Sequence, residues 1–107
     1  MIQHYEIVIS KDALDDIKSM KGYILKQFKY CEYAENFSKK IKQSIQKIKK
    51  FPKAYEKTGY QIEGLDVFVK PCDTYLIFFV VDDAKIIVLR VLKDRMYWKS
   101  VIERIQN

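Results

Sequence analysis

The chain has 107 residues, a length that fits one domain and can bury a core without disulfides or metal ions. Twenty Lys and Arg against fourteen Asp and Glu give a formal net charge of +6, which favours anionic partners but equally serves to keep a small domain soluble. The longest apolar run, 75–81, is far too short to cross a bilayer and argues against a membrane role.

The cysteines and the N-terminal segment indicate the compartment. Cys31 and Cys72 match no CxxC spacing, and the sequence shows no apolar signal segment. We therefore expect a cytoplasmic protein whose two cysteines are structural.

The N-terminal half of the sequence predicts one strand and two helices. Residues 5–9 are mostly apolar and β-branched, and Ser10 follows as a helix N-cap. Apolar residues then recur at steps of three and four along one helical face: Ala13 or Leu14, Ile17, Met20, Ile24 and Phe28. A second series with the same spacing ends at Pro52: Ala34, Phe37, Ile41, Ile45, Ile48 and Phe51. These two helices should form a hairpin.

The outer side of the second predicted helix is the most basic stretch of the chain. No acidic residue occurs between Asn36 and Phe51. The lysines of this stretch are Lys39, Lys40, Lys42, Lys47, Lys49 and Lys50. Two interpretations stay open, an ordinary solvated helix face and a surface that binds an anionic partner.

The C-terminal half predicts a β-meander and a short helix. Residues 52–64 show neither helical nor strand period and predict a surface loop, with or without a short edge strand. Three antiparallel strands are expected over 67–70, 75–81 and 85–92, with a tight connection at 82–84. Both faces of 75–81 are apolar, so this strand should be central and covered on both sides.

A last helix is expected over 96–107, where apolar residues recur at helical spacing: Trp98, Val101, Ile102 and Ile105. Either this helix or another protein chain is expected to cover the second face of the sheet. The predicted fold class is α+β, in the order strand, helix, helix, three strands, helix. One domain spans 1–107.

Three stretches within this order of elements carry a family pattern. They are the Phe51-Pro52 helix stop, the strand Tyr75-Leu-Ile-Phe-Phe-Val-Val-Asp82, and Leu89-Arg90-Val91-Leu92 followed by Lys93, Asp94, Arg95 and Trp98. With them, nearly the whole chain resembles the RelE/ParE toxin superfamily. The resemblance implies a bacterial type II toxin whose curved sheet is backed by two helices and whose surface is wrapped by a cognate antitoxin.

The superfamily divides by activity, and the resemblance leaves two activities open. RelE-like members cleave messenger RNA in the ribosomal acceptor site, whereas ParE-like members poison DNA gyrase without cutting nucleic acid. RNA cleavage needs the 2′-hydroxyl deprotonated, the phosphate charge stabilised and the leaving oxygen protonated, so cations and proton-transfer groups suffice without a metal or other cofactor. We expect a ribosome-dependent endoribonuclease, with gyrase inhibition as the alternative and an inactive relative as the third case.

Five residues near one end of the predicted sheet form the expected site. Lys93 and Arg95 are expected at the reacting phosphate, Tyr97 as proton donor, and Lys70 and Arg90 as supporting phosphate-binding cations. Other roles remain open for two of them: Arg90 in a structural ion pair with Asp66 or Asp94, and Tyr97 packed beside Trp98.

The sequence departs from the family pattern at two positions. Asp66 stands where many relatives have Arg, and Lys93 stands where many have His. Lys70 takes over the phosphate-facing role only if the loop 71–74 is longer than usual. The expected partners are an antitoxin and either the ribosome with its messenger RNA or gyrase.

Overall fold

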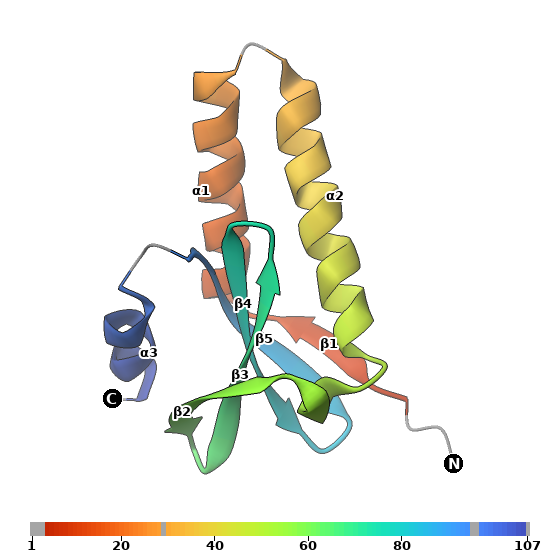
Figure 1. Ribbon diagram of the computed structural model, residues 1–107, viewed down its shortest axis with the longest axis vertical. Helices are drawn as coiled ribbons and strands as arrows, with labels where there is room; N and C mark the ends of the chain where they lie inside the picture. The colour runs from red at the N-terminus through yellow and green to blue at the C-terminus, as the bar shows by residue number, and fades with distance from the viewer. Residues whose placement is uncertain (1–3, 29, 95–96, 107) are drawn as a thin grey trace.

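A five-stranded mixed sheet with helices on both faces forms the protein (Figure 1). The computed structural model describes residues 4–28, 30–94 and 97–106. The elements are β1 (Glu6–Ile9), α1 (Lys11–Gln27), α2 (Cys31–Ile48), the 3₁₀ helix η1 (Pro52–Ala54), β2 (Glu56–Ile62), β3 (Leu65–Cys72), β4 (Tyr75–Asp82), β5 (Lys85–Lys93) and α3 (Trp98–Gln106). The strand order is β1-β5-β4-β3-β2, with β1 parallel to β5 and the other pairs antiparallel. The expected α+β order is confirmed.

The segment expected to be a loop contains a strand longer than the short edge strand we allowed for. Residues 56–62 pair with β3, with a register shift between Lys57 and Gln61. Thr58, Tyr60 and Ile62 are half-buried while the residues between them are exposed. Gly59, with φ of +92°, falls inside this strand and obscures its period in the sequence.

Tight two-residue turns join the strands of the meander. The first residue of each turn has a positive φ: Glu63 (52°), Asp73 (53°) and Asp83 (52°). Such turns match the twist of antiparallel strands. The loop expected over 71–74 is therefore short, because β3 continues through Cys72. Lys70 was expected to face a phosphate only if this loop were longer than usual, and that condition is not met.

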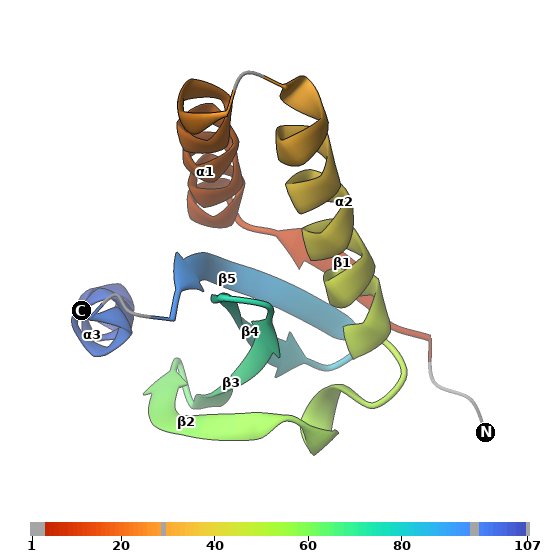
Figure 2. The ribbon, with the colours of Figure 1, turned by 45° about the horizontal axis from the view of Figure 1, so that its top comes forward.

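Two apolar cores lie on opposite faces of the sheet, and β4 contributes to both. Ile77 and Phe79 pack with the helix hairpin, whereas Phe78 and Val80 pack with Ile102 of α3. Figure 2 shows the α1–α2 hairpin on one side of the sheet and α3 well apart from it. The prediction that 75–81 is central and that the C-terminal helix covers the second face is confirmed.

Two residues assigned to the helical core faces are instead exposed, and one open alternative is decided. Of Ala13 and Leu14, Ala13 takes the core position and Leu14 is 45% exposed. Phe28 and Phe51 are 50% and 73% exposed because both lie beyond the ends of their helices. The helical spacing of apolar residues continues in the sequence beyond the end of each helix. The predicted core faces of both helices were therefore too long.

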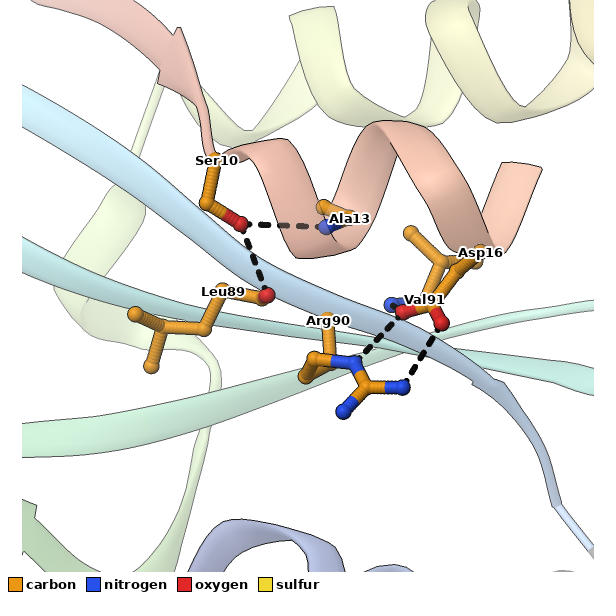
Figure 3. A network of polar contacts seen from close by, with 6 residues as sticks. All are labelled: Ser10, Ala13, Asp16, Leu89, Arg90 and Val91. Atoms are coloured by element: carbon orange, nitrogen blue, oxygen red, sulfur yellow. Dashed lines mark hydrogen bonds and ion pairs between the residues drawn. The ribbon is translucent and has the colours of Figure 1, made fainter. Parts of the chain in front are cut away.

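Ser10 fixes the point where β1 becomes α1. Its Oγ accepts a hydrogen bond from the Ala13 N–H at 3.1 Å, the capping contact the sequence predicted, and donates one to the Leu89 carbonyl at 2.8 Å (Figure 3). Leu89 is the extra residue of a bulge in β5, since Phe78 pairs with Arg90 and Phe79 with Val88. One hydroxyl therefore joins the start of α1 to the irregular point of β5.

Asp16 then fixes the first turns of α1 to the next residues of β5. The Arg90 guanidinium donates from Nε and Nη2 to the two Asp16 carboxylate oxygens, each at 2.7 Å, and the Val91 N–H donates to Oδ2 at 3.0 Å (Figure 3). These hydrogen bonds raise the pKa of Arg90. The structural ion pair considered for Arg90 exists, but its partner is Asp16 and not Asp66 or Asp94.

Replacing Asp16 with Ala should lower the free energy of unfolding by about 2–4 kcal/mol, because it leaves the Arg90 charge and the Val91 N–H without a partner. Urea denaturation followed by circular dichroism measures the change. Asp15→Ala, at the exposed neighbouring position, is the matched control and should change stability by less than about 0.5 kcal/mol. Equal effects of the two substitutions would contradict the role given to Asp16.

Ile102→Ala should destabilise the protein by about 2–4 kcal/mol, because Ile102 is fully buried between α3 and the sheet. The exposed Ser100→Ala on the same helix is the control. A small effect of Ile102→Ala in the same denaturation experiment would mean that α3 does not cover this face in solution.

Candidate functional site

Two of the five expected site residues lie at one pocket between α1 and the end of β5. This pocket has a volume of about 230 Å³ and is lined by Asp16, Ser19, Met20, Tyr23, Tyr75, Arg90, Leu92 and Lys93. Lys93 places its Nζ 4.7 Å from the centre of the Tyr23 ring, a cation–π contact. Because Arg90 pairs with Asp16, both cations of the pocket are engaged by side chains of α1.

Lys70 lies elsewhere, between the sheet and α2. Its Nζ donates a hydrogen bond to the Ser44 Oγ at 2.7 Å and lies 5.8 Å from the centre of the Tyr55 ring. Since β4 runs between β3 and β5, Lys70 and Lys93 are held by different helices on different strands. The structure does not bring Lys70 into the pocket of Arg90 and Lys93.

The two remaining residues of the expected site follow β5. Tyr97 is 89% exposed, and its hydroxyl makes no hydrogen bond to any residue that the structure describes. Trp98 packs against the rings of Phe78 and Tyr60, so the packing alternative for Tyr97 is wrong. Arg95 lies outside the described residues.

Asp66, which stands where many relatives have a cation, is paired within the edge of the sheet. It accepts a hydrogen bond from Gln61 at 3.0 Å and forms an ion pair with Lys57 at 3.3 Å. These contacts lower the pKa of the Asp66 carboxyl, the Gln61 hydrogen bond contributing most. The position therefore carries a compensated negative charge on β3.

The proton-transfer chemistry of the pocket is limited. Burial raises the pKa of the Tyr75 hydroxyl, and the nearby Asp73 and Tyr23 raise it further. Tyr75 therefore stays protonated near neutral pH and can donate a hydrogen bond but cannot act as a base. Among the described residues, no group of three or more His, Cys, Asp and Glu side chains could hold a metal ion, and no helix is long and apolar enough to span a membrane.

An aromatic cluster, which sequence reasoning missed, lies at the turn between α1 and α2. It consists of Phe28, Tyr30 and Tyr33, which are 50%, 67% and 53% exposed. The Tyr33 ring centre lies 5.1 Å from that of Phe28 and 6.5 Å from that of Tyr30. Figure 1 shows this turn at the end of the hairpin that points away from the sheet. The sequence did offer a signal for this cluster. Three aromatic residues gather where the two predicted helices meet, and Tyr30 and Tyr33 do not fit the helical core spacing.

Comparison with known proteins agrees with the resemblance seen in the sequence. The family model described as the ParE toxin of the type II toxin-antitoxin system parDE matches residues 7–98. The solved structure titled as the chromosomal ParDE system from P. aeruginosa matches with a TM-score of 0.68 and 12% identity, covering 85% of this chain and 97% of the other. No curated protein sequence matches the chain significantly.

The two comparisons carry different weight. At 12% identity the structural match supports the fold, whereas the family model covers most of the chain, from β1 to the first residue of α3. A toxin of such a system has a cognate antitoxin as its partner. The chain belongs to the ParE toxin family of type II toxin-antitoxin systems.

Proposed function

We propose that this chain inhibits growth by binding DNA gyrase, the activity of ParE-like toxins, and that it does not cleave messenger RNA. One observation carries the proposal: Lys70, Arg90 and Lys93 are each engaged within the fold, by Ser44, Asp16 and Tyr23. A nuclease site needs its cations to converge on one phosphate. Messenger RNA cleavage, which the sequence favoured, stays a prediction that the same experiment tests.

The two positions at which the sequence departs from the family pattern support this proposal. Asp66 forms an internal ion pair where many relatives have Arg, and Lys93 stands where many have a His, which could exchange protons near neutral pH. Tyr97 has no described partner that would orient or activate its hydroxyl. These features weaken acid–base chemistry and leave protein binding intact.

The aromatic cluster offers a surface for binding a protein target. Aromatic side chains, Tyr above all, supply a large share of the binding energy at protein interfaces because they bury much area at little cost in side-chain entropy. Phe28, Tyr30 and Tyr33 hold one another through ring contacts, so their orientation is set before a partner arrives. We assign the contact with gyrase to this cluster.

Induction of the chain alone in bacteria should cause gyrase-dependent double-strand DNA breaks and an SOS response, without new messenger RNA ends. Break formation and 5′-end mapping are scored in the same culture. Cells that co-express the antitoxin are the control. The opposite result would be new in-frame 5′ ends within translated messenger RNAs, together with unbroken chromosomes. That result would reject the proposal in favour of RNA cleavage.

The double substitution Tyr30→Ala with Tyr33→Ala should weaken gyrase inhibition by about thirtyfold or more, since each exposed aromatic anchor contributes about 1 kcal/mol or more to binding. Inhibition of supercoiling by purified gyrase measures the effect, and circular dichroism checks the fold.

Tyr97→Ala separates the two activities, because Tyr97 is the expected proton donor for RNA cleavage and lies outside the aromatic cluster. Its toxicity should equal that of the unchanged chain. Loss of toxicity in Tyr97→Ala together with full toxicity in the double variant would contradict the assignment of gyrase binding to the cluster.

A further inference from the structure

The net positive charge of the chain comes from one segment. Residues 36–53 contain seven Lys and no acidic residue, whereas the rest of the chain carries thirteen basic and fourteen acidic side chains. Most of this segment is α2, and every exposed residue between 38 and 50 is a Lys or a Gln. The charge of this protein is therefore a local property of one helix and not a general feature that keeps it soluble.

Four lysines of this segment share one side of the helix. At 3.6 residues per turn, Lys39, Lys42, Lys49 and Lys50 fall within about a third of the circumference, away from the buried positions such as Ile41 and Ile45. Lys49 keeps helical backbone angles at the C-cap, so the row continues past the last turn. We call these four residues the lysine stripe.

No lysine of the stripe forms an ion pair with any residue that the structure describes. The only described lysine of α2 in an ion pair is Lys40, which contacts Asp73 at 3.3 Å on the other flank of the helix. Four like charges along about 16 Å of helix repel one another, and nothing in the packing of α2 requires them, since they are exposed. Their arrangement suits an external row of negative charges.

The composition of the surface around the stripe indicates which anion fits. An acidic polypeptide would need apolar anchors at the centre of its interface. The exposed residues of 38–50 include none, and the exposed Phe51 follows the last lysine of the stripe and so lies beyond its end. Contacts to a nucleic-acid backbone need only cations and hydrogen-bond donors, which Lys and Gln supply. A duplex carries about nine phosphate charges, counted over both strands, along the length of the stripe, so it offers enough charge for four lysines.

We propose that the lysine stripe of α2 binds the phosphate backbone of duplex DNA, without reading its sequence. The aromatic cluster and the stripe then occupy the same helical hairpin, so this protein can contact a protein target and the DNA that the target holds. The DNA contact itself needs no gyrase. The proposal of DNA binding is therefore independent of the gyrase function proposed above.

The test measures binding of the purified chain to a fluorescent 30-base-pair DNA duplex by anisotropy. Four phosphate contacts give a slope of about −3.6 for log affinity against log salt, so affinity should fall about a hundredfold between 50 and 200 mM salt. Replacing Lys39, Lys42, Lys49 and Lys50 together with Gln should lower affinity at 50 mM salt by about tenfold or more and flatten the slope.

A matched variant carries Lys→Gln at four exposed lysines outside α2: Lys11, Lys18, Lys26 and Lys85. It has the same net charge as the stripe variant and should keep at least half of the original affinity.

Equal loss in both variants would overturn the assignment to α2, and so would absence of duplex binding at 50 mM salt. Binding to single-stranded RNA or to polyglutamate at least tenfold tighter than to the duplex would overturn the choice of ligand. Because the assay contains no gyrase, its failure leaves the gyrase proposal standing, and failure of gyrase inhibition leaves this one standing.

Discussion

From Arg90 onward the outer edge of β5 has no strand beside it, because β1 ends at Ile9 opposite Val88. The Asp16 carboxylate replaces that strand: it accepts the Val91 N–H and holds the Arg90 guanidinium, while Ser10 takes the Leu89 carbonyl. A helix thus completes the hydrogen bonding of a sheet edge, which would otherwise leave polar groups unpaired near the core. The direction of α1, and with it the position of the hairpin, depends on this substitution of a carboxylate for a strand.

The same arrangement divides the molecule into a supporting part and a projecting part. Both faces of the sheet pack into apolar cores. Three of its cations, Lys70, Arg90 and Lys93, contact side chains of α1 or α2. The aromatic cluster lies at the distal end of the hairpin, and the lysine stripe runs along the exposed side of α2 toward the sheet. The three strand cations expected to serve a nuclease therefore have their partners on the two helices within the fold.

Periodicity predicted the helices, the three-stranded meander and the double burial of 75–81 because long apolar segments bury whole faces. It failed for β2, an edge strand whose pattern is interrupted by Gly59, and for Phe28 and Phe51, whose spacing continues the helical pattern after the helix has ended. The partner of Arg90 could not be predicted either. Asp16 is 74 residues away, and only the path of α1 across β5 brings the two side chains together. The local spacing of apolar residues predicts helices and strands. Contacts between distant helices and strands depend on the assembled fold and cannot be predicted from that spacing.

The parallel pairing of the first strand with the last affects how the protein is made. Ser10 and Leu89 are separated by 79 residues, so β1 and α1 have no sheet to join until β5 has left the ribosome. At about 5–20 residues per second, translation of that interval takes about 4–16 s. During this time the apolar face of the hairpin and the edges of the growing sheet lack their native partners. A nascent chain of this topology therefore cannot complete its sheet before β5 has been synthesised.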